Sequence, residues 1–133
     1  MKNAKLLDAF PLVQFIKRET GSERTKALLA SAVKSGAPLL ISEINAGEVF
    51  YAIARKLGAD RAEEVLAELF ALPLQRIPVT WELVLAAAKL KAQWAMSYAD
   101  CFAAATAIQR QAVLVTGDPE FKQIEHLVSI EWV

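Results

Sequence analysis

Apolar residues along the chain recur with two different periods. Five short apolar runs have the length and composition of β-strands. They are residues 5–7, 38–41, 76–79, 113–116 and 128–132. Between these runs, apolar residues repeat every three to four positions, as in an amphipathic helix. The clearest such stripe is Ala62, Val65, Leu66, Leu69 and Phe70. The pattern therefore predicts strands that alternate with helices.

Capping residues mark where the predicted helices begin and end. Ser, Thr and Asp are preferred at helix N-termini, and Gly is preferred just after the C-terminus. The N-cap candidates are Ser22, Ser42, Asp60, Thr80 and Ser97, and the closing glycines are Gly36 and Gly58. We therefore expect helices over residues 9–17, 22–36, 42–58, 60–70, 81–95 and 98–110, with a short helix from Pro119.

The alternation predicts an α/β fold, a three-layer α/β/α sandwich around a mostly parallel central sheet. Pro78 indicates that its strand lies at an edge of the sheet or ends there, because proline has no N–H to donate. No repeat or linker interrupts residues 1–133, so we expect one domain. In such a sheet, ligands bind at the carboxyl ends of the strands.

Composition narrows the class of protein. With 133 residues, 55% of them hydrophobic, the chain can bury a sizeable core. No apolar run reaches the length of a membrane span, and the residues before Asp8 do not resemble a signal peptide. Cys101 is the only cysteine, which excludes an intrachain disulfide and a cysteine-based zinc site. We expect a cytoplasmic protein without a membrane partner.

Charge is unevenly divided along the chain, although the formal net charge is zero. Residues 1–62 contain ten Lys or Arg and six Asp or Glu, whereas residues 63–133 contain five and nine. The first part is therefore +4 and the second −4. This asymmetry favours one surface for a polyanion and another rich in carboxylates, with scattered solvated charges as the simpler interpretation.

Four carboxylates fall at the carboxyl edge of the predicted sheet. Asp8 and Asp118 follow two strands, and Asp100 begins the helix that leads back to the strand at 113–116. Glu48 is one and a half turns into the helix after the second strand. Carboxylates crowded together cannot all stay ionised without a cation, and all-oxygen ligation suits Mg²⁺ or Mn²⁺. Such ions can assist hydrolysis of a phosphodiester.

Each of these acids also has a simple structural explanation. Asp8 and Asp118 are good N-cap residues, Ser97-x-x-Asp100 resembles a capping box, and Glu48 could reach solvent. Nucleophile chemistry fits poorly, because the only histidine, His126, is not placed to serve a cysteine or serine as a base.

Four segments together resemble the PIN-domain family. They are LLDAF, INAGEVFYAIARKLG, SYADCFAAATAI and LVTGDPEF. The similarity is greatest to the VapC-type toxins of this family, the ribonuclease halves of toxin–antitoxin pairs, and it runs from about Lys5 to Val133. The resemblance implies a parallel sheet sandwiched by helices, in agreement with the fold derived above.

The resemblance also implies a function, namely hydrolysis of single-stranded or looped RNA that depends on Mg²⁺ or Mn²⁺. It assigns catalysis and metal binding to Asp8, Glu48, Asp100 and Asp118, with Thr116 beside the last acid. It implies two protein partners as well, a cognate antitoxin and a second copy of the chain. We expect a basic side chain of the antitoxin tail to enter the acidic pocket.

One position departs from the family pattern. Many members have Ser, Thr or Asn two residues after the first aspartate, where this chain has Phe10. The polar support of the site is therefore in doubt, and Asn45 or Ser42 could supply it instead. Candidates for contacts with the RNA backbone, with a solvated helix surface as the alternative, are Lys17, Arg18, Arg24 and Lys26.

Two other functions stay open from the sequence. A receiver-like phosphoacceptor domain also uses clustered acids and Mg²⁺, but it would need an aspartate pair after the first strand, where only Asp8 stands. A catalytically silent PIN-like RNA-binding or scaffold domain would be expected to have lost acids, and all four are present.

The helix over residues 81–95 is apolar on more than one stripe. Its apolar positions include Trp81, Val84, Leu85, Ala88, Leu90 and Trp94. An amphipathic helix that packs on one core needs a single stripe, so the excess favours self-association as a dimer. Burial of the helix between its neighbours is the alternative.

Overall fold

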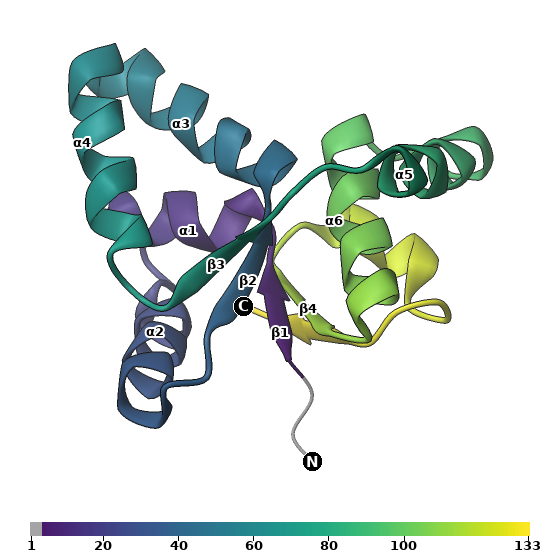
Figure 1. The fold of residues 1–133 in the computed structure, drawn as a ribbon, viewed down its shortest axis with the longest axis horizontal. Helices are drawn as coiled ribbons and strands as arrows, with labels where there is room; N and C mark the ends of the chain where they lie inside the picture. Colours follow the sequence, from purple (N-terminus) through teal and green to yellow (C-terminus); the bar gives the residue numbers. More distant parts are fainter. Residues whose placement is uncertain (1–3) are drawn as a thin grey trace.

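Strands and helices alternate along residues 4–133, which the computed structural model describes (Figure 1). The strands are β1 (Lys5–Leu7), β2 (Leu39–Ser42), β3 (Leu74–Ile77), β4 (Val113–Thr116) and β5 (Ile130–Trp132). The helices are α1 (Ala9–Ile16), α2 (Glu23–Ser35), α3 (Glu43–Leu57), α4 (Ala59–Phe70), α5 (Trp81–Gln93), α6 (Tyr98–Arg110) and the 3₁₀ helix η1 (Pro119–Ile124). The predicted alternation is confirmed.

All five strands are parallel and lie in the order β3-β2-β1-β4-β5. In the central strand β1, Leu6 lies beside Leu40 of β2 and Leu114 of β4. The chain builds the sheet outward from β1 to β3, then returns to start β4 on the other side of β1. The strand order therefore reverses between β1 and β4. In open parallel sheets, ligands bind at such a switch point, outside the carboxyl ends of the strands.

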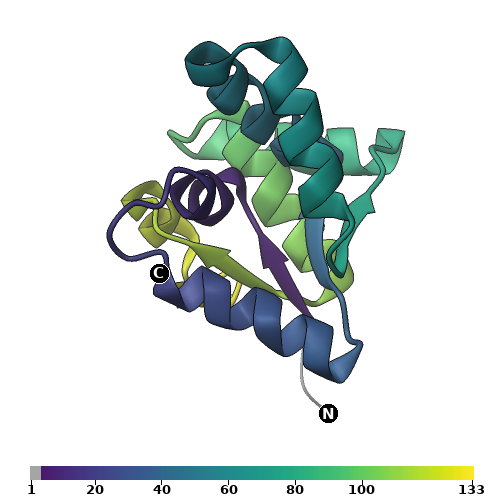
Figure 2. The same ribbon diagram turned by 90° about the vertical axis from the view of Figure 1, so that its left-hand side faces the viewer.

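Alternate side chains of the strands enter two separate cores. Leu6 and Leu114 face a core formed with α5, α6 and η1. Leu7, Ile41 and Val115 face a second core formed with α1, α2, α3 and α4. In Figure 1 the two sets of helices lie on opposite sides of the sheet, and Figure 2 shows α2 lying across one face. The predicted three-layer α/β/α sandwich is confirmed.

Side-chain caps fix three of the predicted helix starts. The hydroxyl oxygens of Ser42, Thr80 and Ser97 each accept the backbone N–H three residues later. The predicted cap at Asp60 is wrong, because α4 begins one residue earlier and Asp60 lies in its first turn. Gly58 has a φ of 88° and both ends α3 and begins α4. Since this backbone conformation favours glycine, the turn between the two helices needs no further residue.

Strand boundaries differ from the prediction by one or two residues. β3 covers Leu74–Ile77 rather than residues 76–79, and β5 begins at Ile130 rather than at residue 128. Pro78 has no N–H to donate, so the pairing of β3 with β2 ends at Ile77, opposite Ser42. β3 forms one edge of the sheet, as its proline predicted.

α5 buries part of the apolar surface that suggested a dimer. Val84, Leu90 and Trp94 pack against the core beside α6, whereas Trp81 and Leu85 are 72% and 41% exposed. The apolar excess is thus concentrated in these last two side chains. None of the helices described over residues 4–133 has both the length and the apolar character that a membrane crossing needs.

Candidate metal centre

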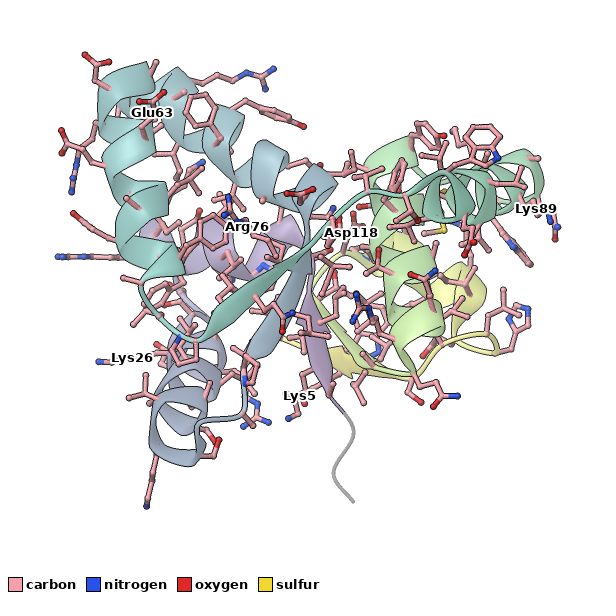
Figure 3. The ribbon with its side chains drawn as sticks, in the orientation of Figure 1. Lys5, Lys26, Glu63, Arg76, Lys89 and Asp118 are labelled. Atoms are coloured by element: carbon pink, nitrogen blue, oxygen red, sulfur yellow. The ribbon has the colours of Figure 1, made fainter. Side chains whose placement is uncertain are left out.

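A cavity of about 290 Å³ opens at the carboxyl edge of the sheet. Its walls include the carboxylates of Asp8, Glu48, Asp100 and Asp118. Asp8 follows β1 and Asp118 follows β4, while Glu48 belongs to α3 and Asp100 to α6. Figure 3 shows Asp118 near the middle of the molecule, between α3 and α6. Four acids that are far apart in the sequence thus line one cavity at the switch point.

Asp8 is both a helix cap and a wall of the cavity. Its Oδ1 accepts the N–H of Phe10 at 3.2 Å, which caps α1, and its Oδ2 accepts the hydroxyl of Thr116 at 2.7 Å. Asp8 is only 3% exposed. Both oxygens are therefore held, and the carboxylate has one fixed orientation.

Thr116 links the first acid to the last. Its Oγ1 donates to Asp8 and accepts the N–H of Asp118 at 3.1 Å. Oδ1 of Asp118 in turn accepts the N–H of Glu120 at 2.9 Å and caps η1. The buried hydroxyl of Thr116 therefore joins the ends of β1 and β4 across the switch point. Capping and lining the cavity are not alternatives here, because Asp8 and Asp118 do both.

Glu48 is held by a buried amide. Nδ2 of Asn45 donates to Oε1 of Glu48 at 2.8 Å and to the carbonyl of Ala99 at 3.2 Å. Oγ of Ser42 donates to Oδ1 of Asn45 at 2.8 Å. Through Ala99 this network also ties α3 to the first turn of α6, next to Asp100. Asn45 and Ser42, the two candidates for polar support, thus lie beside the site.

Burial and mutual repulsion raise the pKa of two of the acids. Burial raises the pKa of Asp8 from 3.8 to about 8; the charges of Asp100 and Glu48 add to the shift, and the Thr116 hydroxyl opposes it. Burial, and then the charges of Asp118 and Glu48, raise the pKa of Asp100 from 3.8 to about 7. A bound cation would reverse the repulsion and favour the ionised forms. The cavity is therefore suited to positive charge.

Two further carboxylates near the four acids were not predicted. An oxygen of Glu120 lies within 4.8 Å of oxygens of Asp100 and Asp118, and Glu19 lines the cavity. The spacing Asp118-x-Glu120 at the start of a short helix could have indicated the first. Glu19 has no local signal, because it reaches the cavity from the loop after α1, which a hydrogen bond from Gln14 holds.

Comparison with known families identifies the fold. A sequence model of the PIN domain matches residues 5–127. The chain belongs to the PIN domain family. The resemblance seen in the four sequence segments is thereby confirmed. No curated protein sequence matches this PIN domain significantly.

Solved structures match this PIN domain over nearly its whole length. VapBC from Salmonella typhimurium, bound to DNA, gives a TM-score of 0.76 at 18% identity and covers 98% of both chains. VapBC2 from Rickettsia felis, bound to a promoter DNA fragment, gives 0.73 at 21% identity and also covers 98% of both. VapC20 from Mycobacterium tuberculosis, a toxin that cleaves the sarcin-ricin loop, gives 0.74 at 17% identity and covers 90% of this chain and 94% of that one. At these identities the likeness shows a shared fold.

Phe10 stands where the family resemblance predicts a polar residue, and it lines the cavity with 43% of its surface exposed. Its ring lies over Gly117, where an added Cβ would come within 2.3 Å of a ring carbon. The glycine between Thr116 and Asp118 therefore leaves the space that the ring fills. This contact joins the first turn of α1 to the loop after β4.

The basic residues proposed for RNA contacts have other surroundings in this PIN domain. Arg24 forms an ion pair with Glu131 at 2.8 Å. Arg18 and Lys26 line a separate hollow beside α1, α2 and α4. Figure 3 shows Lys26 at the outer side of α2, away from Asp118. Although Arg18, Arg24 and Lys26 are close together in the sequence, they do not line the acidic cavity. Their contact with RNA stays a prediction.

Proposed function

We propose that this PIN domain is a metal-dependent endoribonuclease, the toxin of a VapBC-type toxin–antitoxin pair. One observation carries the proposal: four carboxylates from four different elements line a single cavity. Within residues 4–133, no Lys or Arg side chain forms an ion pair with any of the four. Buried carboxylates are costly unless a positive partner compensates them, so the missing partner is expected to come from outside the chain.

The donors available in the cavity fit Mg²⁺ or Mn²⁺. All are carboxylate oxygens, which these hard cations prefer, and burial together with the neighbouring carboxylates raises the pKa of Asp8 and of Asp100, so a cation would favour their ionised forms. Asp8, Glu48, Asp100 and Asp118 would hold the ion, with Glu120 close enough to assist. When bound, such an ion neutralises charge on the scissile phosphate and assists the attack of water.

The remaining residues of the site position the carboxylates. Thr116 fixes Asp8 and the backbone of Asp118, and Asn45 fixes Glu48. Because each of these bonds is buried or partly buried, the donors do not need to reorganise when a cation and a phosphate arrive. Hydrogen bonds of this kind, made by groups behind the ligands, orient and tune metal sites.

The partners follow from the same proposal. The VapBC structures that share this fold contain an antitoxin chain, and we extend that partnership to this chain. A basic side chain of the antitoxin tail in the cavity would compensate the same carboxylates. Neutralising two of them in an Asp8→Asn/Asp118→Asn variant should then weaken antitoxin binding. Unchanged affinity would show that the tail binds elsewhere.

A cytoplasmic location and a homodimer belong to the proposal as well. In the dimer, Trp81 and Leu85 of α5 lie at the interface. Light scattering at micromolar concentration should give the mass of two chains. Trp81→Glu should shift the mass toward one chain, and a wild-type monomer would contradict the dimer.

Cleavage of a labelled RNA that contains single-stranded loops tests the activity. Wild-type protein should cleave it with Mg²⁺ or Mn²⁺ and not in excess EDTA, and Asp100→Asn should be inactive. Asp60→Asn is the matched control, because Asp60 is an exposed acid in the first turn of α4 and does not line the cavity. Full cleavage in EDTA, or an active Asp100→Asn variant, would refute the proposal.

A further inference from the structure

Two exposed aromatic side chains flank the acidic cavity. Phe10 of α1 and Tyr51 of α3 both line it, with 43% and 47% of their surfaces exposed. Exposed apolar side chains that are scattered singly need no explanation. Two aromatic rings that share one cavity with at least four carboxylates are different, because the two kinds of group do not stabilise each other.

The side chain of Arg55 lies next to the Tyr51 ring, on the side of the cavity where the aromatic residues are. The guanidinium of Arg55 lies 4.8 Å from the centre of the Tyr51 ring. Glu48, Tyr51 and Arg55 follow one another at spacings of three and four residues, so they share one face of α3. Seven residues of helix span about 10 Å, the length of roughly three stacked nucleotides. This face therefore presents a carboxylate, a ring and a guanidinium in a line that leads away from the proposed metal centre.

We infer that Phe10, Tyr51 and Arg55 form a binding track for unpaired nucleotides next to the cleaved bond. The inference rests on the proposed function and adds the residues that hold its substrate beside the metal centre. Phe10 and Tyr51 stack on bases, and Arg55 contacts a phosphate on the far side of Tyr51. Stacking on aromatic rings is how proteins hold splayed bases whatever their sequence, and it excludes a duplex, whose bases are already stacked.

Charge favours a nucleic acid over a protein segment as the occupant of this track. A basic antitoxin tail would be attracted by the carboxylates but repelled by Arg55. A polynucleotide brings negative charge to Arg55 and planar bases to the two rings. The bond to be cut then lies beside the carboxylates, whose repulsion of phosphate is removed by the proposed cation.

The position of the Phe10 ring depends on the backbone at Gly117 as well as on its own helix, α1. Gly117 leaves the space for the ring, since a Cβ there would come within 2.3 Å of it. The backbone of Gly117 is not at a positive φ, so alanine is acceptable to the main chain. Gly117→Ala therefore displaces the ring without changing any side chain that touches substrate.

Binding to a cleavage-inactive protein tests the track without depending on catalysis. The probe is a ten-nucleotide single-stranded RNA that carries 2-aminopurine, whose fluorescence falls when it stacks on an aromatic ring. It is titrated with Asp100→Asn protein in Mn²⁺. Adding Tyr51→Leu or Phe10→Leu should weaken binding by about tenfold each and restore the fluorescence. Tyr51→Phe and Phe10→Tyr keep a ring and should bind like their parent.

Matched controls separate stacking from general damage to the protein. Trp132→Leu removes a partly exposed aromatic ring of β5 that does not line the cavity, and it should leave RNA binding unchanged. Arg55→Gln should lower both the affinity and its dependence on salt, because one phosphate contact is lost. In the wild-type background, Tyr51→Leu should raise KM more than it lowers kcat.

The outcomes distinguish the track from the proposed activity. Leucine variants that bind RNA like the parent would overturn the track and leave the ribonuclease proposal standing. Stacking and binding by a wild-type protein that never cleaves would support the track and refute the activity. Leucine variants that weaken antitoxin binding but not RNA binding would assign the rings to the protein partner and overturn the inference.

Discussion

Asp8→Asn should make the metal-free protein more stable at neutral pH, even though it removes a carboxylate that holds a helix cap. Asp8 is 3% exposed, and its pKa rises from 3.8 to about 8, mainly because of burial. Between these two pH values the folded chain keeps a proton that the unfolded chain has released. The free energy of unfolding therefore falls as the pH rises through this window. Asparagine is neutral at every pH and avoids this loss.

The size of the effect follows from the pKa shift. At 1.36 kcal/mol per pKa unit, keeping Asp8 protonated at pH 7 costs the folded state about 4 kcal/mol. Asparagine can still accept the N–H of Phe10 through Oδ1, but an NH2 donor replaces the Oδ2 that accepts the Thr116 hydroxyl, so about 1 kcal/mol is lost with that hydrogen bond. The variant should therefore gain about 3 kcal/mol at pH 7 and be slightly less stable than wild type below about pH 4.5.

Urea denaturation in EDTA from pH 4 to 8.5 measures both curves. When Mn²⁺ replaces EDTA, the same urea denaturation should show a higher free energy of unfolding for the wild type and a nearly unchanged one for Asp8→Asn. The reason is that a ligand stabilises only the state that binds it. Asp60→Asn is the control, since an exposed acid in the first turn of α4 should show neither effect. If Asp8→Asn gains no stability relative to wild type between pH 5 and 8, burial in the cavity does not destabilise the carboxylate of Asp8, and the reasoning is refuted. If it keeps the Mn²⁺ shift, Asp8 acts only as a helix cap.

Substitutions at Thr116, Asn45 and Gly117 test the groups that position the carboxylates and the Phe10 ring. Thr116→Val should lower the free energy of unfolding by about 1–3 kcal/mol, because it removes the hydrogen bonds of Thr116 with Asp8 and with the N–H of Asp118. Thr116→Ser keeps the hydroxyl and should be close to wild type. Equal stability of the wild type and both variants in urea denaturation would show that these hydrogen bonds do not stabilise the fold. Asn45→Leu should likewise cost about 1–3 kcal/mol and reduce cleavage, and a fully active variant would show that Glu48 needs no support. Gly117→Ala should destabilise the protein by about 1 kcal/mol, because the added methyl displaces the Phe10 ring, and Phe10→Leu should relieve most of that cost in a double-mutant cycle. Additive effects in the cycle would show that the ring is free to move away.

The sequence by itself determined the elements and their order. The repeat of apolar residues in a strand or a helix involves residues two to four positions apart, so a short stretch of sequence is enough to predict it. The same holds for the caps at Ser42, Thr80 and Ser97, each of which accepts an N–H three residues later. The expected cap at Asp60 was wrong, because α4 begins directly after Gly58, which the local pattern had assigned only to the end of the preceding helix.

The sequence also determined that the acids share one edge of the sheet. Parallel strands place their carboxyl ends together, so Asp8 and Asp118 had to lie on the same side. It could not determine that they are neighbours. Their adjacency requires β4 to pair with β1, a contact between segments 108 residues apart, as the hydrogen bond between Asp8 and Thr116 shows.

Only the tertiary structure decided what each carboxylate meets. Asn45 reaches Glu48 along α3 but reaches Ala99 only because α6 packs against α3. The contact of Phe10 with Gly117 depends on the same convergence of distant segments. Such contacts are stabilised by burial of the two cores on either side of the sheet, which is a property of the whole packed chain. Local periodicity sets the positions on each element, and the packing of the layers sets which positions meet.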